Sequence, residues 1–243
     1  MKMVAAVASV GAMLALAGTA FAGTPTVFSF NFQNLSGSFS TGTSQFAAIA
    51  ESGPSQINSV GSVSRTASPG STASFDAGFV AGIDPSNFQL NLGVSNTLGF
   101  NASGFGSFLI VDKDGDTLSG TVSGDRTLGM GFTQSGPTVF YFGALSNVIF
   151  TPFPASGNTT WDGPNGGSFD FTTLPGGPIF SGAIVELHMN TSGTPFWTTD
   201  WGYNGGQGTP VPVGVNAELV PAPGAAALLG LGGLIAGRRR RTR

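Results

Sequence analysis

The chain contains no cysteine, and only 9% of its 243 residues are charged. No disulfide can hold this fold together, so its stability has to come from a hydrophobic core, which about 200 residues can supply. Histidine is almost as scarce, because His188 is the only one. A single histidine excludes a His-rich zinc site and leaves one possible base for a serine triad.

Positive charge is nearly absent from the middle of the chain. Six of the nine basic residues lie at the two ends of the chain. Residues 23–219 contain the other three, Arg65, Lys113 and Arg126, together with all twelve acidic residues, so this part of the chain has a net charge of −9. A field of that sign repels phosphate backbones and anionic lipid head groups. We therefore expect no nucleic-acid partner and no membrane contact through basic patches.

Phenylalanine is abundant, with 21 residues, 20 of them after residue 22. Disordered chains have few aromatic residues and many charges, which is the opposite composition. The sequence therefore predicts a folded domain with an aromatic core.

The N-terminus has the layout of a secretory signal peptide. Lys2 is followed by the apolar run 4–18 and then by Ala20, Phe21 and Ala22 before Gly23. A charged start, a short apolar run and a small-x-small tripeptide are typical of such signals. We expect residues 1–22 to be removed by cleavage between Ala22 and Gly23, in contact with the export machinery.

The C-terminal segment 220–243 combines prolines, an apolar run and an arginine cluster. Pro221 and Pro223 disfavour helix before them, so we expect an apolar helix to start near Gly224. The fourteen residues from Gly224 to Gly237 would span about 21 Å as a helix, less than the hydrocarbon core of about 30 Å. The cluster that follows, made of Arg238, Arg239, Arg240 and Arg241, is expected to stay in the cytoplasm.

This tripartite layout resembles the PEP-CTERM sorting signals of bacterial exported proteins. The resemblance implies that an exosortase-like membrane peptidase processes the tail near Pro221, Pro223 and Gly224 and passes the protein to the cell surface. Ala222 stands where that family usually has an acidic residue. An ordinary membrane anchor with a stop-transfer arginine cluster is the alternative.

Between these ends, the hydrophobic period is two. Phe28, Phe30 and Phe32 alternate with Ser29 and Asn31, as in a half-buried strand. Further strands are expected at 88–94, 108–111, 118–122, 139–142, 148–150, 179–189 and 211–219, the last an edge strand because of Pro210 and Pro212. Segments 36–44 and 61–74 are expected to be loops, and 45–51 one helical turn.

Turn signals separate these runs at close spacing, including Ser68-Pro69-Gly70 and Asp114-Gly115. Many short strands joined by such turns predict an all-β fold over residues 23–219, a single antiparallel β-sandwich of the jelly-roll type. An N-terminal signal helix and a C-terminal apolar helix would flank it.

Three carboxylates alternate at Asp112, Asp114 and Asp116, which resembles the opening of a calcium loop, with Asp125 as the natural fourth ligand. The calcium-loop pattern fails afterwards, and a charged Asp-Gly hairpin tip explains the same residues. We therefore expect no cofactor, with calcium as the alternative.

The aromatic residues Trp197, Trp201 and Tyr203 share one face if 196–203 is a strand, and Trp161 falls in a Gly/Asn-rich loop. Such rings can form a flat platform for an extracellular polysaccharide, although large aromatics are more often core residues. Glu186 and His188 point the same way on a strand and are more simply explained as a polar outer face than as a catalytic pair.

These observations predict an exported, surface-sorted structural or extracellular-matrix protein without catalytic activity. A carbohydrate-binding module using the aromatic platform is the alternative, and a glycan-acting enzyme is a third hypothesis.

Overall fold

The computed structural model describes residues 25–52, 57–76, 79, 86–99, 101–135, 137–177, 179–190, 197–202 and 211–222. These residues form an all-β fold with two short 3-10 turns, η1 and η2, which confirms the predicted fold class. The elements are β1 Phe28–Ser40, β2 Gln45–Ile49, β3 Val60–Arg65, β4 Ser71–Phe75, β5 Asn87–Leu98, β6 Asn101–Val111, β7 Thr117–Gly124, η1 Arg126–Leu128, β8 Gly131–Ser135, β9 Thr138–Thr151, β10 Thr160–Asp162, β11 Ser168–Asp170, η2 Phe171–Thr173, β12 Ile179–Asn190, β13 Trp201–Gly202 and β14 Val211–Pro221.

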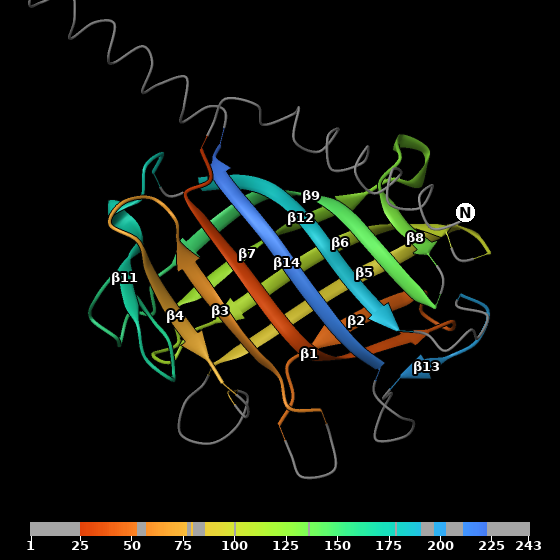
Figure 1. Cartoon of the computed structure of the whole chain (residues 1–243), viewed down its shortest axis with the longest axis horizontal. Helices are drawn as coiled ribbons and strands as arrows, with labels where there is room; N and C mark the ends of the chain where they lie inside the picture. Colours follow the sequence, from red (N-terminus) through yellow and green to blue (C-terminus); the bar gives the residue numbers. More distant parts are fainter. Residues whose placement is uncertain are drawn as a thin grey trace, which may run out of the picture.

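Eight strands close into an antiparallel barrel in the order β1, β2, β5, β6, β7, β9, β12, β14, with β14 pairing back to β1 (Figure 1). Each barrel strand lies beside the next barrel strand along the chain, as in an up-and-down barrel. Four further strands extend this barrel sheet. β3 pairs with β1 and β4 with β3, β8 pairs with β6 and β9, and β13 pairs with β1. The barrel strands form one closed sheet rather than two facing sheets, so the predicted jelly-roll sandwich is replaced by a barrel.

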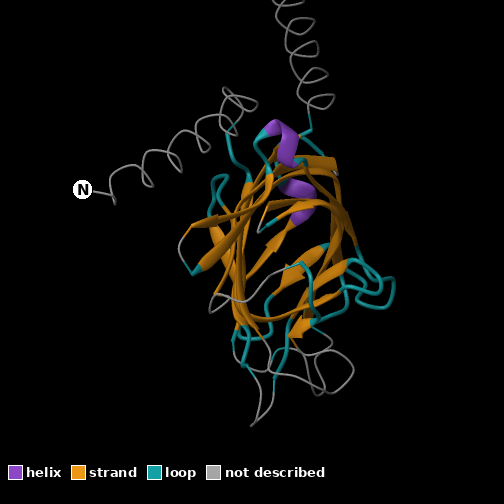
Figure 2. Ribbon diagram, turned by 90° about the vertical axis from the view of Figure 1, so that its right-hand side faces the viewer, coloured by secondary structure: helices purple, strands orange, loops and turns teal. Residues whose placement is uncertain are grey.

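The two ends of the barrel differ. We call the end where β1 begins and β14 ends the chain-end pole; β11 and β4 lie toward it, on the left of Figure 1. At this pole the N–H of Val27 donates to the carbonyl of Leu219 at 2.8 Å. The opposite end, which we call the far pole, carries β8 and β13 on the right of Figure 1. Figure 2 shows the strands wrapped around the interior from a second direction.

Phenylalanine rings fill that interior. Phe28, Phe30 and Phe32 all point inward from β1 and are fully buried. The ring of Phe30 lies 5.3 Å from that of Phe108 on β6, and the ring of Phe32 lies 4.7 Å from that of Phe88 on β5. Tilted and edge-to-face pairs at these distances are favourable beyond their buried area. The period-two pattern of β1 therefore directs its phenylalanine rings into the core, where they contact rings from β5 and β6.

Asparagine marks three of the irregularities in the barrel strands. Asn34, Asn96 and Asn147 have φ values of 55°, 51° and 51°, in the left-handed region that asparagine tolerates better than most residues. Each falls where the register of a strand shifts, in β1, β5 and β9 respectively. Bulges of this kind bend and twist a strand, which a sheet needs in order to close.

Several expectations about local structure are wrong, for one common reason. Residues 45–51, expected as a helical turn, contain β2; residues 36–44 contain the second half of β1; and residues 61–74 contain most of the β3–β4 hairpin. Serine, threonine and glycine favour loops locally, but ladder pairing overrides that preference, with partners on both sides of β1, β2 and β3 and on one side of β4. The runs 139–142 and 148–150 are parts of the single long strand β9.

β14 is not an edge strand, because β1 and β12 pair with its two sides. Its pairing with β12 ends at the Met189–Val213 pair, one residue short of Pro212. A proline needs no donor partner at that position, which explains how it fits into a closed barrel.

At Gly106 on β6, the backbone of β5 comes so close that a side chain does not fit. A Cβ atom at this position would overlap the carbonyl oxygen of Asn91 on β5. We expect Gly106→Ala to lower the free energy of unfolding by about 1 to 3 kcal/mol, because the backbone has to move. Gly93→Ala on the same strand pair is the control, since its nearest atoms lie at 3.4 and 3.5 Å. Equal stability of the two variants in urea unfolding would contradict the prediction.

Candidate functional site

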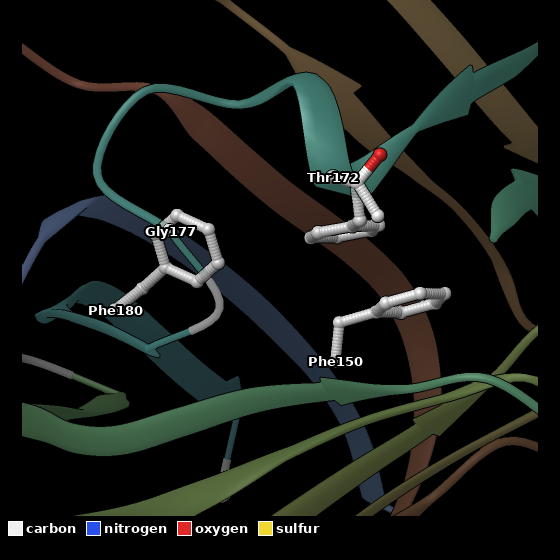
Figure 3. Close-up of a pocket in the computed structure, with 5 residues that line it drawn as sticks. Phe150, Thr172, Gly177 and Phe180 are labelled. Atoms are coloured by element: carbon white, nitrogen blue, oxygen red, sulfur yellow. The ribbon is translucent and has the colours of Figure 1, made fainter.

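An apolar pocket of about 170 Å³ opens at the chain-end pole. Figure 3 shows its walls: Phe150 and Thr172 on one side, Gly177 and Phe180 on the other. Phe171 is the remaining lining residue. None of the five lining side chains is charged. A pocket of this size and character suits a group as large as a benzene ring or a branched aliphatic side chain.

The turn η2 forms the roof of the pocket. Oδ1 of Asp170 accepts hydrogen bonds from the N–H of Thr172 at 2.8 Å and from its hydroxyl at 2.7 Å, which fixes the first residues of the turn. These hydrogen bonds to the carboxylate lower the pKa of Asp170. Phe171 is thereby directed inward, where its ring stacks on Phe150 with centroids 4.6 Å apart and an interplanar angle of 7°.

The floor of the pocket joins the barrel core. The ring of Phe28 meets Phe171 edge-on at 5.2 Å and Phe180 at 5.0 Å. On the outside, Arg65 at the end of β3 reaches η2, because its Nη2 atom donates to the carbonyl of Thr173 at 3.3 Å. The walls of the pocket are therefore held by packing from inside and by a charge-assisted hydrogen bond from outside.

The chain leaves the barrel directly beside this pocket. Pro221, the last residue of β14, pairs with Phe180, and the N–H of Ala222 donates to the carbonyl of Ile179 at 3.2 Å. Gly176 packs against Pro221 so closely that a Cβ atom on this glycine would overlap the proline ring. The predicted sorting residue Pro221 is thus built into the barrel and buried. Residues 223–243, with Pro223, Gly224 and Arg238 to Arg241, lie outside the described residues, as do Ala20, Ala22 and Gly23.

The acidic turn between β6 and β7 lies at the same pole. Asp112 is fully buried, and its Oδ1 atom accepts from the N–H groups of Asp114 and Asp116, both at 2.9 Å. Its Oδ2 atom accepts from the N–H of Asp162 at 2.8 Å, which ties the turn to β10. Burial raises the pKa of Asp112 to about 6; these hydrogen bonds oppose that rise, and the nearby carboxylate of Asp116 adds to it. Hydrogen bonds to Asp112 therefore hold the β6–β7 turn against β10.

Three oxygen atoms of these carboxylates already accept hydrogen bonds from the protein. Both oxygens of Asp112 are engaged by backbone donors, and Oδ1 of Asp116 accepts from the N–H of Phe153 at 2.5 Å and from the hydroxyl of Ser156 at 3.2 Å. Asp125, expected as a fourth ligand, caps η1 at the far pole, on the other side of the eight-residue strand β7. Among the residues that the structure describes, no group of three or more His, Asp or Glu side chains could hold a metal ion. The expected hairpin between 108–111 and 118–122 is present as β6 and β7.

Two of the four rings considered for an aromatic platform are core residues, so the favoured interpretation of Trp197 is confirmed and the expected exposed ring at Trp161 is wrong. Trp161, expected in an exposed loop, is fully buried on β10, and Trp197 is 6% exposed. The ring of Trp197 packs edge-on against Phe39 at 4.9 Å and against Phe132 at 4.6 Å, at the far pole. Trp201 is half-buried, and Tyr203 lies outside the described residues. Burial of these rings is favourable because large aromatic side chains remove a large apolar area from water.

Glu186 and His188 lie on the outer face of β12, as expected. Oε1 of Glu186 is 3.5 Å from Nδ1 of His188, and both side chains are well exposed. Nδ1 makes no hydrogen bond, so the 3.5 Å distance describes a close contact of the two side chains rather than an oriented hydrogen bond.

The pocket residues Phe150, Phe171 and Phe180 were not predicted from the sequence. Two of them lay on predicted strands, but nothing in their spacing brings them to one barrel end. The useful local signal was the Asp-x-Thr pattern, which occurs at Asp170–Thr172 and Asp125–Thr127 and caps both 3-10 turns.

Comparison of the chain with protein-family models, curated proteins and solved structures finds no match. In the part of the chain that the structure describes, no helix is long and apolar enough to cross a membrane. The fold and site thus define a class, an up-and-down antiparallel barrel with an apolar pocket beside its chain exit.

Proposed function

We propose that the chain is an exported structural protein of the cell surface or extracellular matrix, without catalytic activity, that an exosortase-like peptidase sorts through its C-terminal segment. The observation that carries this proposal is that both ends of the barrel strand path lie at one pole, where Val27 bonds to Leu219. The predicted signal peptide and sorting segment therefore extend from the same end. A barrel joined to the membrane at this pole leaves its far pole and outer face directed away from the cell.

The Phe-filled interior supports a structural role. Fully buried rings from β1, β5 and β12 occupy the barrel, as in small barrels whose interior is filled by side chains. Because side chains fill the interior, a barrel of this kind interacts with its surroundings through its outer surface.

The mass of the native surface protein tests the sorting proposal. We expect the mature chain to begin at Gly23, to lack Arg238 to Arg241 and to end close to Pro223, because Ala222 is still hydrogen-bonded to the barrel. Intact-mass spectrometry of the surface protein measures both ends. Recovery of Arg243 on fully exported protein would favour permanent anchoring instead. A parallel variant without Arg238 to Arg241 should still be exported but should lose surface retention.

A further inference from the structure

The apolar pocket lies beside Ala222, the last described residue, which comes two residues before the C-terminal apolar segment. Phe180 lines the pocket, and its neighbour Ile179 accepts the hydrogen bond from Ala222, the last described residue. Segment 224–237 then begins two residues later, and its first large aliphatic side chains are Leu228 and Leu229. A further apolar surface adjoins the exit, because Ile149 and Ile179 pair across β9 and β12 and are 39% and 44% exposed.

The tether is long enough for these leucines to enter the pocket. Six residues from Ala222 to Leu228 reach about 20 Å when extended and about 9 Å as a helix. The pocket wall starts at the residue next to the hydrogen-bond partner of Ala222, so both lengths suffice. A short tether also gives the segment an effective concentration on the order of millimolar at the pocket.

The pocket matches this occupant in size and chemistry. Its volume of about 170 Å³ and its three phenylalanine rings suit one branched aliphatic side chain (Figure 3). We propose that Leu228 or Leu229 occupies this pocket when the C-terminal segment is in water, so that the barrel shields the start of its own apolar tail. This docking requires only the apolar segment and the pocket, and does not depend on sorting or processing.

The absence of cysteine allows a direct test by disulfide trapping. In the chain from Gly23 to Arg243, Thr172→Cys is combined with Leu228→Cys or with Leu229→Cys. Thr66→Cys with the same tail substitutions is the matched control, because Thr66 is an exposed threonine at the same pole, where its N–H donates to the carbonyl of Val27. Thr127→Cys, at an exposed threonine of the far pole, is the control that the tail cannot reach. Disulfides form only when the two Cα atoms come within about 7 Å. In detergent-free buffer we expect cross-linking at position 172 to be at least about tenfold faster than at position 66.

A second measurement covers variants that fail to form the bond. The thiol at position 172 is reacted with a modifying reagent in chains with the natural tail and with Leu228→Asp and Leu229→Asp together. We expect the double aspartate change to speed modification at 172 by about tenfold and to leave position 127 unchanged. Near-ultraviolet circular dichroism checks that each chain is folded.

Three outcomes would overturn the proposal. Equal cross-linking at 172 and 66 would mean that the tail moves freely over the chain-end pole without entering the pocket. Equal modification rates with either tail would mean that the tail does not cover the pocket. Protection of position 172 that needs phosphatidylcholine vesicles and persists in the double aspartate chain would assign the pocket to a lipid acyl chain.

Discussion

Phe32→Ala is expected to lower the free energy of unfolding by about 3 to 5 kcal/mol, which is the usual cost of deleting a buried phenylalanine ring. The ring of Phe32 lies within 6.2 Å of those of Phe30, Phe75, Phe79 and Phe88, so its removal leaves a cavity that several elements have to share. Rings packed on all sides cannot all move inward to fill it. Urea unfolding followed by tryptophan fluorescence measures the change.

Phe105→Ala is the matched control for this experiment. Phe105 lies on β6 with its side chain on the outer face and 45% exposed, so its truncation should cost less than about 1 kcal/mol. The same loss in both variants would mean that the Phe-filled interior is not the main source of stability.

The free energy of unfolding is expected to fall as the pH rises from about 4 to above 6, through the titration of Asp112. Its pKa is about 6 in the folded chain and about 4 in an unfolded chain, so the folded state binds the extra proton. The protonated form thus adds stability that is fully present below pH 4 and is lost as the pH passes 6. A difference of two pKa units corresponds to about 3 kcal/mol.

Comparison with Asp112→Asn isolates this contribution, because the amide does not titrate. Relative to that variant, the natural protein should lose about 2 kcal/mol between pH 4 and pH 7 in urea unfolding. Asp200→Asn provides a control of opposite sign. Hydrogen bonds from Thr41 lower the pKa of Asp200, so its stabilising effect is present above the ordinary value and is lost as the pH falls. A constant difference between the natural protein and Asp112→Asn across this range would refute the role of burial at Asp112.

Hydrophobic periodicity predicted the strands whose two faces differ most. Phe28, Phe30 and Phe32 alternate with polar residues, and β1 begins where that pattern begins. The same reasoning could not predict closure, because closure depends on which strands pair. The pairing of Phe28 with Leu219 joins residues 191 positions apart, and no local pattern encodes that contact.

The site was less predictable than the fold. A tryptophan in a Gly/Asn-rich stretch suggested an exposed ring at Trp161, yet β10 folds over the barrel end and buries it. Asp112 was noticed for its charge, but its role as an acceptor for three backbone N–H groups depends on β10, which is fifty residues away. Residues at this pole thus acquire their roles from long-range neighbours.

If the chain is exported as proposed, the pairing of the first barrel strand with the last determines the order in which the barrel can fold. A chain that crosses the membrane from its N-terminus delivers β1 first and its partner β14 last, so one edge of β1 has no partner until nearly the whole chain has emerged. The hairpins formed by β5, β6 and β7 need only local contacts and can form early, whereas barrel closure has a large loop-closure cost and comes late. In the proposed export, completion of translocation therefore sets the earliest moment at which the barrel can become native, and until then the exposed edge of β1 is a site for pairing with other chains.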